Sequence, residues 1–595
     1  MEIVLKEKIK EAVQTIYNSE VKDDLIQIQE TRKDFKGDLT LVVFPLLRFS
    51  KNTPETTGDT IGQYLVDHFQ AVSGYNVIKG FLNLEISDTW WIDYFKKLTV
   101  EKNHLENCRV SNPEIILVEY SSPNTNKPLH LGHIRNNLLG FSLYRILSGC
   151  GHTVIKTNIV NDRGIHICKS MLAWQKFGNG ESPESTGLKG DHLVGKYYVL
   201  FEKEYKAQIE KLVQTGMDEA EARNAAPLMT ESRDMLLKWE KGDKEVVDLW
   251  KMMNSWVYAG FDETYKKLGV DFDKIYYESD TYKTGKEIVL KALNEKILYR
   301  NEDSSIWADL TSVGLDQKLL LRSDGTAVYM TQDLGTAVAR HNDYKFDKNI
   351  YVVGNEQNYH FQVLKALLKR LGYPWADGLM HFSYGMVELP EGRMKSREGT
   401  IVDADDLIDE MQMTARDVSL ELGKLGDFSN IEKEDIFRKI GLAALKYYIL
   451  KVDPKKNMTF NPAESIDFNG NTGPFIQYTY TRIKSVFRKA EQMDIITEKA
   501  DFSGTKAGPK EIELIKLLSK FSETVSAAAA GYSPALIANY CYDLSREYNQ
   551  FYHDFSILGE SDEEIKNFRL VLSKVTSEIL YTGMWLLGIE MPERM

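Results

Sequence analysis

Cysteine is scarce in this chain, and the few cysteines are scattered. The 595 residues include four, Cys108, Cys150, Cys168 and Cys541, with no Cys-x-x-Cys pair among them. A zinc knuckle needs such pairs, and a disulfide framework needs a denser set of cysteines. We therefore expect reduced, mostly buried thiols, no structural zinc and no metal ion held by protein side chains.

Long hydrophobic runs are absent as well. No apolar stretch approaches the roughly 20 residues of a membrane-spanning helix, and the start, Met1 to Lys8, lacks the apolar core of a signal peptide. With 43% hydrophobic and 27% charged residues, the composition is typical of globular proteins. We expect a cytoplasmic monomer that has no membrane partner and folds into about four structural units.

An overall excess of positive charge is missing too. The formal net charge is -13, which counts against a polyanionic partner such as nucleic acid if it is taken globally. The range 446–489 is a local exception, because it holds eight basic and three acidic residues. Its aromatic residues suit unstacked RNA bases, although a solvated basic helix face fits the composition equally well. These aromatic residues include Tyr447, Tyr448, Phe475, Tyr478 and Tyr480.

The stretch from residue 115 to 146 predicts a strand, a loop and a helix. Ile115 to Val118 is a continuous apolar run typical of a buried parallel strand. Pro123 and Pro128 exclude regular structure from the loop, and apolar residues recur at helical spacing from Ile134 onward. A parallel strand that leads into a helix leaves backbone N–H groups and the positive end of the helix dipole at the carboxyl edge of the sheet. The stretch therefore predicts a phosphate site at this edge.

The start of the predicted helix carries two histidines one turn apart. His130 and His133 flank Gly132, where a ligand can approach the backbone closely. Both imidazoles can donate hydrogen bonds to phosphate oxygens. Taken alone, this spacing more often marks a core histidine beside a helix cap, and a zinc pair is a third option. The preceding Lys127 and the two-proline loop favour a phosphate.

The extended string from Glu119 to His133 is more specific than the two histidines. It reads Glu-Tyr-Ser-Ser-Pro-Asn-Thr-Asn-Lys-Pro-Leu-His-Leu-Gly-His, and it resembles the HIGH signature of class I aminoacyl-tRNA synthetases, in the form found in arginyl-tRNA synthetases. The resemblance continues to Met595 and is weakest between residues 175 and 300.

The resemblance implies an α/β fold in three parts. A class I Rossmann-type catalytic domain with a parallel sheet is expected over residues 109–424, with a helical insertion over residues 176–310. An N-terminal α+β domain that contacts tRNA is expected over residues 1–108. A C-terminal α-helical bundle that binds the anticodon is expected over residues 425–595.

Hydrophobic periodicity predicts individual elements inside these parts. Glu2 to Tyr17 predicts an amphipathic helix, and the alternation from Gly80 to Ile86 predicts a strand. Long amphipathic helices are predicted in the last part of the chain, over Ile436 to Val452, Pro474 to Gln492, Pro509 to Ala530, Pro534 to Tyr552 and Glu563 to Leu587.

The resemblance also implies an arginine site. Tyr329, Asp333, Gln357, Glu119 and Asn124 match arginine-contacting positions of the family. Asp333 with Tyr329 is assigned to the guanidinium, whose planar fork of donors a carboxylate accepts bidentately. Asn124 and Gln357 are assigned to the amino-acid head group. Glu119 is assigned to either of the two cationic groups of arginine, the guanidinium or the α-ammonium. Without the resemblance, Asp333 is more often a helix cap or part of a surface salt bridge.

A basic turn at residues 392–400 resembles the KMSKS loop of the class, which neutralises the triphosphate as pyrophosphate forms. It departs from the class pattern because Ser396 stands where the second lysine is usual. Many arginyl enzymes share that loss. The resemblance implies that the lysine just before the HIGH motif, Lys127 in this chain, substitutes for the missing loop lysine. How Lys127, Arg393, Lys395 and Arg397 divide the neutralisation of the triphosphate stays open. Without the resemblance, a basic turn is usually a solvated loop. The expected catalytic residues are His130, His133, Lys127, Arg393, Lys395 and Arg397.

ATP is the cofactor that the resemblance implies, with Mg²⁺ bound to its phosphates. The residues expected to contact ATP are Gly132, Gly385, Met386, Val387 and Met394.

The segment Asp467 to Tyr478 resembles the start of the anticodon-binding bundle in arginyl-tRNA synthetases. Despite its glycines it is no phosphate loop, because no strand is predicted before it. Aromatic residues at helical spacing are more often core than RNA contacts, so we expect most of them to be buried. Tyr478, Arg482 and Lys484 are the expected tRNA contacts.

The function implied is the ATP-dependent ligation of L-arginine to tRNA(Arg) through an arginyl-adenylate, with activation that waits for tRNA. Three alternatives remain. Another class I specificity is the nearest, although a cysteinyl enzyme needs zinc ligands and the large-aliphatic group needs a longer editing insertion. A small-molecule nucleotidyltransferase shares the His-x-Gly-His chemistry but needs no basic, aromatic bundle. A noncatalytic RNA-binding paralogue would not need the phosphate cradle formed by Lys127, His130, Gly132 and His133, which this chain retains.

Overall fold

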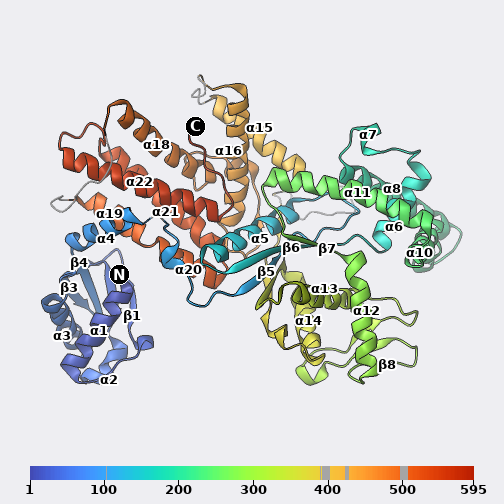
Figure 1. Ribbon diagram of the computed structural model, residues 1–595, viewed down its shortest axis with the longest axis horizontal. Coiled ribbons are helices and arrows are strands. Elements are labelled where there is room, and N and C mark those ends of the chain that lie inside the picture. Colours follow the sequence, from blue (N-terminus) through green and yellow to red (C-terminus); the bar gives the residue numbers. More distant parts are fainter. Residues whose placement is uncertain (102, 389, 391–401, 422–425, 427, 496–506) are drawn as a thin grey trace. The chain divides into compact units, whose positions relative to one another are not determined.

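The computed structural model describes residues 1–101, 103–388, 390, 402–421, 426, 428–495 and 507–595 (Figure 1). The chain forms two compact units, which are described separately. The first unit comprises Met1–His104, Val486–Phe521 and Arg546–Ile579. The second unit comprises Leu105–Ser485, Ser522–Ser545 and Leu580–Met595.

The amino-terminal part of the first unit combines helices with an antiparallel sheet. Helix α1 (Glu2–Tyr17) has the predicted bounds. Helix α3 (Pro54–His68) is capped by Thr53, whose side chain accepts from the N–H of Thr56. The sheet has the order β1-β2-β4-β3. Its strands are β1 (Gln27–Glu30), β2 (Leu39–Val42), β3 (Val72–Ile78) and β4 (Phe81–Ile86). The predicted N-terminal α+β architecture is therefore confirmed.

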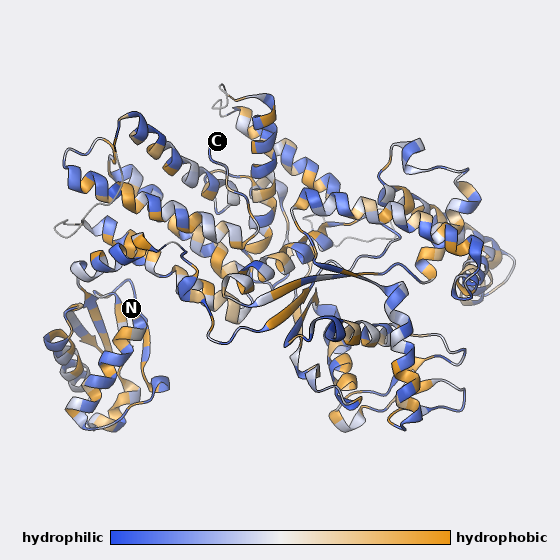
Figure 2. Cartoon of the chain, viewed as in Figure 1, coloured by the Kyte–Doolittle hydropathy of each residue, from blue (hydrophilic) through white to orange (hydrophobic). Residues whose placement is uncertain are grey.

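The second unit is built on a five-stranded parallel sheet with the order β12-β11-β5-β6-β7. Its strands are β5 (Ile115–Glu119), β6 (Thr153–Val160), β7 (Lys274–Tyr277), β11 (Lys348–Gly354) and β12 (Leu379–Tyr384). The central strand β5 is buried and hydrophobic along most of its length (Figure 2). A strand in the middle of a parallel sheet is covered on both faces, which is why its residues are continuously apolar.

The order of the strands reverses at β5. Helix α5 (Leu131–Gly149) connects β5 to β6 on one side, whereas β11 pairs with β5 on the other side. Helices α13 (Tyr329–Tyr344) and α14 (Asn358–Arg370) pack with the sheet around a core that includes Leu117, Leu334 and Leu364. A reversal of this kind opens a crevice at the carboxyl ends of the strands, where α/β proteins bind their ligands.

The expected helical insertion at residues 176–310 needs a correction. Its helical part ends with α11 (Lys244–Leu268), and β7 then returns to the main sheet as its edge strand, paired in parallel with β6. A small antiparallel sheet of β8 (Tyr299–Arg300), β9 (Ile306–Ala308) and β10 (Lys318–Leu321) follows. The strand was missed because four residues with one buried side chain give almost no periodic signal. The helices between β6 and β7 are α6 (Ile165–Phe177), α7 (Pro183–Thr186), α8 (Gly190–Gln214), α9 (Glu219–Ala225), α10 (Pro227–Glu240) and α11.

The last part of the chain is helical. The helix predicted over Pro509 to Ala530 is divided into two, because α19 ends at Ser519 and α20 begins at Phe521. The longer helices are α15 (Ala404–Glu421), α16 (Asn430–Leu450), α18 (Gly473–Gln492), α19 (Pro509–Ser519), α20 (Phe521–Gly531), α21 (Pro534–Asp554) and α22 (Glu563–Leu586). The other predicted helices of this part end and begin within a few residues of these bounds. The one larger difference is the start of α16, which was predicted at Ile436 and lies six residues earlier.

Two expectations from composition can be compared with the structure. All four cysteines are buried, which confirms the predicted environment of the thiols. Within the described ranges, no helix is both long enough and apolar enough to cross a membrane.

Candidate active site

All five strands of the parallel sheet end at one edge, and polar residues stand at or just after the ends of four of them. The residues at or just after the strand ends are Glu119 on β5, Asn161 and Asp162 after β6, Glu278 after β7, the turn Asn355–Gln357 after β11, and Gly385 after β12. Parallel strands bring their carboxyl ends together, so segments distant in sequence meet here. This edge is therefore the candidate site.

The loop after β5 begins with a strained turn. Ser121 and Ser122 have φ values of 82° and 47°, a region that residues other than glycine rarely adopt. Two asparagine side chains hold the turn, because the N–H of Ser121 donates to Asn136 Oδ1 at 2.5 Å and the N–H of Ser122 donates to Asn158 Oδ1 at 3.0 Å. The loop then runs beside the end of β6, where the exposed Asn124 forms a parallel bridge with Asn161. The strain fixes the path of the segment that carries the histidines.

His130 and His133 cap the start of α5 with the same ring nitrogen. The Nδ1 atom of His130 accepts from the N–H of Gly132 at 3.1 Å, and the Nδ1 atom of His133 accepts from the N–H of His130 at 3.2 Å. Because a backbone N–H can only donate, both Nδ1 atoms are unprotonated and both rings carry their proton on Nε2. A Cβ atom at Gly132 would lie 3.0 Å from His130 Cε1, so glycine also makes room for the ring.

Burial keeps both imidazoles neutral. Desolvation, with the nearby charge of Lys127, lowers the pKa of His130 to about 3 and the pKa of His133 well below its usual value. The two rings therefore present neutral Nε2–H donors beside the amino terminus of a helix of 19 residues. This arrangement is suited to bind phosphate oxygens without a change in protonation.

Lys127 supplies a charge next to the histidines. Burial lowers the pKa of its ammonium, and no ion pair to it exists within the described part of the chain. Lys127 and His130 line a cavity of about 200 Å³ together with residues of α8 and Asp403. An unpaired, partly desolvated ammonium in a cavity favours an anionic ligand.

The segments that flank residues 391–401 contact the histidine loop. The N–H of Leu131 donates to Val402 O at 3.2 Å, and the N–H of Ala404 donates to Leu129 O at 3.0 Å. On the other flank, Arg135 Nη1 of α5 donates to Met386 O at 3.1 Å. Four of the expected residues lie outside the described residues, so their positions stay a prediction. They are Arg393, Met394, Lys395 and Arg397.

The residues expected to bind ATP after β12 lie close to the same helix. Gly385 leaves no room for a side chain, since a Cβ atom would lie 2.4 Å from the carbonyl carbon of Lys456. Its N–H donates to Pro454 O at 2.9 Å, and Val387 pairs in parallel with Met458. The segment Gly385 to Val387 thus forms a fixed wall at the end of β12.

The predicted arginine-binding residues lie around α13 and the end of β11. Tyr329 begins α13 and is 69% exposed, and Asp333 follows one turn later. Asp333 Oδ2 accepts from His360 Nε2 of α14 at 2.5 Å. The exposed Gln357 lies three residues before His360, in the turn after β11. His360 therefore links Asp333 to the segment that carries Gln357, and the Asp333 carboxylate is partly open to solvent.

Glu278 is a further candidate at this edge of the sheet that the sequence analysis did not single out. It begins α12 (Glu278–Asn294) directly after β7 and is 4% exposed. Burial raises the pKa of its carboxyl to about 8; Asp162 and Asp333 add to the rise, while Arg163 opposes it. Glu278 thus lies within electrostatic reach of Asp333 across the packed helices α12 and α13. The sequence offered no clear signal for Glu278, because the short strand β7 before it was not predicted.

Glu119 has an internal partner that the prediction did not include. Its carboxylate forms a buried ion pair with Arg340 of α13, which is fully buried. The Arg340 guanidinium also lies over the rings of Tyr276 and Tyr351, at 5.1 and 5.6 Å from their centroids. Ser122 Oγ donates to the other carboxylate oxygen at 3.1 Å. In this structure Glu119 joins the strained turn to α13, so the assignment of Glu119 to substrate stays a prediction.

The basic segment of the last helices is partly core. Lys446 is 3% exposed and donates to Gly588 O at 2.7 Å, and burial lowers its pKa to about 7. Lys446 is therefore unsuited to contact RNA. Tyr447 and Tyr480 are buried, as was expected of most aromatic residues in this segment. The three expected tRNA contacts are half-buried on α18: Tyr478, Arg482, whose guanidinium lies 5.0 Å from the Tyr478 ring centroid, and Lys484, which pairs with Glu593 at 3.1 Å.

Comparisons with known proteins agree with the fold. Residues 95–461 match the family described as tRNA synthetases class I (R), catalytic domain, and residues 476–595 match the DALR anticodon binding domain. The arginine–tRNA ligase of Bacteroides thetaiotaomicron is 59% identical over 98% of each chain, and that of Flavobacterium psychrophilum is 53% identical over 100% of this chain and 99% of its own.

A solved structure gives the same result. The arginyl-tRNA synthetase of Thermus thermophilus superposes with a TM-score of 0.79 at 25% identity, over 100% of this chain and 99% of that one. The identities of 59% and 53% to arginine–tRNA ligases over nearly the whole length exclude the other class I specificities and the small nucleotidyltransferases. The chain belongs to the arginyl-tRNA synthetases, the class I ligases that join arginine to its tRNA.

Proposed function

We propose that the two histidines and Lys127 hold the phosphates of ATP while the carboxylates of Asp333 and Glu278 hold the arginine guanidinium. The observation that carries this assignment is the pair of neutral Nε2–H donors at the start of α5, fixed by two backbone hydrogen bonds. Donors that are already oriented need no reorganisation as charge develops on the leaving pyrophosphate.

In the first step, the arginine carboxylate attacks the α-phosphorus of ATP in line with the departing pyrophosphate. The new oxygen–phosphorus bond gives arginyl-adenylate, and the bond to the pyrophosphate oxygen breaks. ATP enters as its magnesium complex, and the ion is treated as part of the substrate. His130, His133 and Lys127 bind the phosphates, and the helix dipole of α5 adds to the field. Asn124 and Gln357 orient the amino-acid head group.

In the second step, a ribose hydroxyl of the terminal tRNA adenosine attacks the acyl carbon, and adenylate leaves. By the class I relationship this is the 2′-hydroxyl. Tyr478, Arg482 and Lys484 are proposed to contact tRNA(Arg), with the domain division at residues 108 and 424 as predicted. The enzyme is proposed to act as a monomer in the cytoplasm. None of these steps requires a covalent link to the protein.

Replacing Lys127 with alanine is expected to lower kcat for arginine-dependent ATP–pyrophosphate exchange by about 100-fold, the cost of one charged donor to a developing oxyanion. The assay contains tRNA(Arg), because activation in this family waits for it. Lys196→Ala is the matched control, since Lys196 lines the same cavity but is already paired with Glu181 at 2.7 Å. A defect confined to the transfer of arginine from preformed adenylate would show that Lys127 does not serve the adenylation step.

Arginine binding is expected to release close to one proton at pH 7. The pKa of Glu278 is about 8 in the free enzyme, so its carboxyl is mostly protonated at pH 7, and a guanidinium beside it would stabilise the ionised form. The affinity for arginine should therefore rise with pH from 6 to 8. Titration calorimetry in buffers of different ionisation enthalpy measures the release, and Glu278→Gln should abolish it. Equal apparent enthalpies in all buffers for the unaltered enzyme would remove Glu278 from the pocket.

A further inference from the structure

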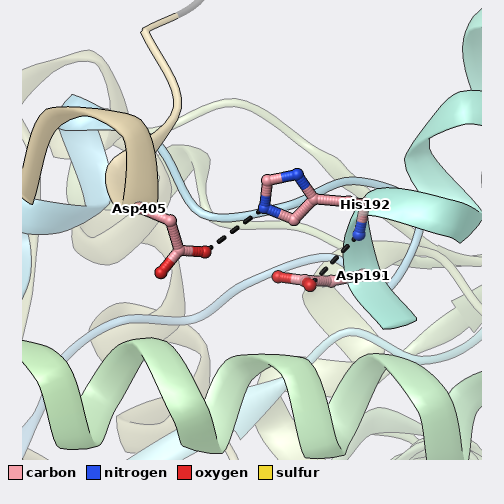
Figure 3. A group of neighbouring side chains, drawn as sticks. All are labelled: Asp191, His192 and Asp405. Carbon is pink, nitrogen blue, oxygen red and sulfur yellow. Dashed lines mark hydrogen bonds and ion pairs between the residues drawn. The ribbon is translucent and has the colours of Figure 1, made fainter. Parts of the chain in front are cut away.

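A cluster of acidic and basic side chains joins the helical insertion to the helix that follows residues 391–401. Asp191 and His192 lie in the first turn of α8, and Asp405 lies in the first turn of α15 (Figure 3). The imidazole of His192 points to the Asp405 carboxylate, with Nε2 at 3.2 Å from Oδ2. The three side chains also have the spacing of a metal site.

An ammonium already occupies the centre of this cluster. Lys189 Nζ lies 2.5 Å from Asp405 Oδ2 and 3.2 Å from Asp191 Oδ2, and it donates to Thr264 Oγ1 at 2.5 Å. A divalent cation would have to displace this ammonium from the same oxygens. The cluster is therefore satisfied internally, and its role is structural or positional.

Asp405 is the point at which three segments converge. It is 6% exposed, yet it accepts from Lys189 and His192 at the start of α8, and from Thr264 of α11 at 3.2 Å. Lys267 of α11 adds a more distant charge at 3.6 Å. Although desolvation opposes it, the bonds from His192 and Lys189 hold the pKa of Asp405 below its usual range. A buried carboxylate with several charged donors is held in one position.

The residue two positions earlier pairs with the phosphate-binding histidine. Asp403 and His130 form an antiparallel bridge, through the hydrogen bonds of Leu131 with Val402 and of Ala404 with Leu129. The Asp403 carboxylate accepts from the N–H of Asp405 at 2.8 Å and lies 3.5 Å from His192 Nε2. The backbone that supports His130 is therefore continuous with the start of α15, which the cluster holds.

Helix α8 also packs directly on the loop that carries Lys127. A Cβ atom at Gly195 would lie 2.8 Å from Pro128 Cδ, so the helix and the loop are in close contact. The cluster and this contact lie one helical turn apart on α8. Together they connect the insertion to two of the three proposed phosphate-binding residues, Lys127 and His130.

We propose that Asp405 is a positioning residue for adenylation, which acts by fixing the backbone pair of Asp403 and His130 against α8. The insertion is then part of the catalytic apparatus, since its residues Lys189 and His192 orient the phosphate cradle. This inference rests on the proposed role of His130 in binding ATP.

The test compares Asp405→Asn with the control Asp409→Asn in the full-length enzyme with tRNA(Arg). Asp409 lies one turn later on α15, is paired only at 3.6 Å with Lys267 among the described contacts, and has a side chain that is 59% exposed. Asparagine at position 405 keeps the volume but loses the charge that binds Lys189 and His192. We measure kcat and KM for ATP and for arginine by pyrophosphate exchange, normalised to active sites counted from the burst of adenylate.

For Asp405→Asn we expect kcat per active site to fall by about 10-fold to 100-fold, as for a small displacement of a catalytic group. KM for ATP should rise and KM for arginine should stay within about twofold, since only the phosphate cradle moves. Asp409→Asn should match the unaltered enzyme. If Asp405→Asn folds too poorly to assay, His192→Gln replaces it, with a change in the same direction.

Two results would overturn the inference. One is a lower unfolding temperature for Asp405→Asn with kcat per active site and both KM values unchanged, which indicates a purely structural cluster. The other is an equal rise of both KM values, which indicates a general disturbance of the site. His130→Ala is measured in parallel. If its kcat and KM for ATP are unchanged, the proposed role of His130 in binding ATP is wrong, whatever the result for Asp405→Asn.

Discussion

Replacing Asp333 with asparagine is expected to raise KM for arginine by on the order of 100-fold, with KM for ATP nearly unchanged. The variant removes the charge that accepts the guanidinium fork, and truncating one partner of a hydrogen-bonded charge pair costs about 3 kcal/mol, which corresponds to a change in affinity of on the order of 100-fold. The phosphate cradle at α5 belongs to other elements and is left intact. Pyrophosphate exchange at varied arginine and ATP concentrations, with tRNA(Arg) present, measures both constants.

Citrulline is the matched control for this variant. It has the shape of arginine but no charge, so it gains little from the Asp333 carboxylate. The ratio of arginine to citrulline affinity should fall in Asp333→Asn, because the variant loses affinity for the cation alone. An unchanged KM for arginine, or an equal loss for both ligands, would remove Asp333 from the guanidinium site.

The second large effect is expected from Arg340→Met, which leaves the buried carboxylate of Glu119 without its partner. Breaking a buried ion pair by removing one member costs about 3 to 5 kcal/mol. Since the chain has two compact units, one unfolding midpoint does not report on this pair. Hydrogen exchange of the backbone amides in β5 and α13 is the local measurement, and both elements should lose protection.

A double variant separates the charge from the packing. In Glu119→Gln with Arg340→Met no buried charge is left unpaired, so most of the lost protection should return. If Arg340→Met alone leaves the hydrogen-exchange protection of β5 and α13 unchanged, the ion pair of Glu119 with Arg340 does not stabilise these elements. If Glu119→Gln raises KM for arginine more than Asp333→Asn does, the sequence prediction that Glu119 binds arginine is restored.

Much of the fold follows from local patterns. The helix Glu2–Tyr17 and the strand–loop–helix from β5 to α5 were predicted because each carries its own periodicity and its own breakers. The insertion shows the limit of this reasoning. Strand β7 belongs to the sheet only through its pairing with β6, more than 100 residues earlier, and nothing in its four residues announces that partner.

In the candidate site, too, residues within one local motif could be predicted, whereas residues that depend on distant packing could not. His130, His133 and Lys127 are neighbours in sequence, so one motif indicated all three. Glu278 is a lone acidic residue in the sequence, and it became a candidate only when α12 was seen to pack on α13, near Asp333. The partner of Glu119 was missed for a related reason, because Arg340 lies on α13, in the middle of an ordinary amphipathic helix, and nothing local distinguishes it from a surface arginine.

The most direct test is a crystal structure of the enzyme with a non-hydrolysable arginyl-adenylate analogue. We predict that the guanidinium lies between the carboxylates of Asp333 and Glu278, and that the bridging group between arginine and adenosine lies within hydrogen-bond distance of Nε2 of His130 or His133. A guanidinium bound away from both carboxylates, or a bridging group on another side of α5, would contradict the account.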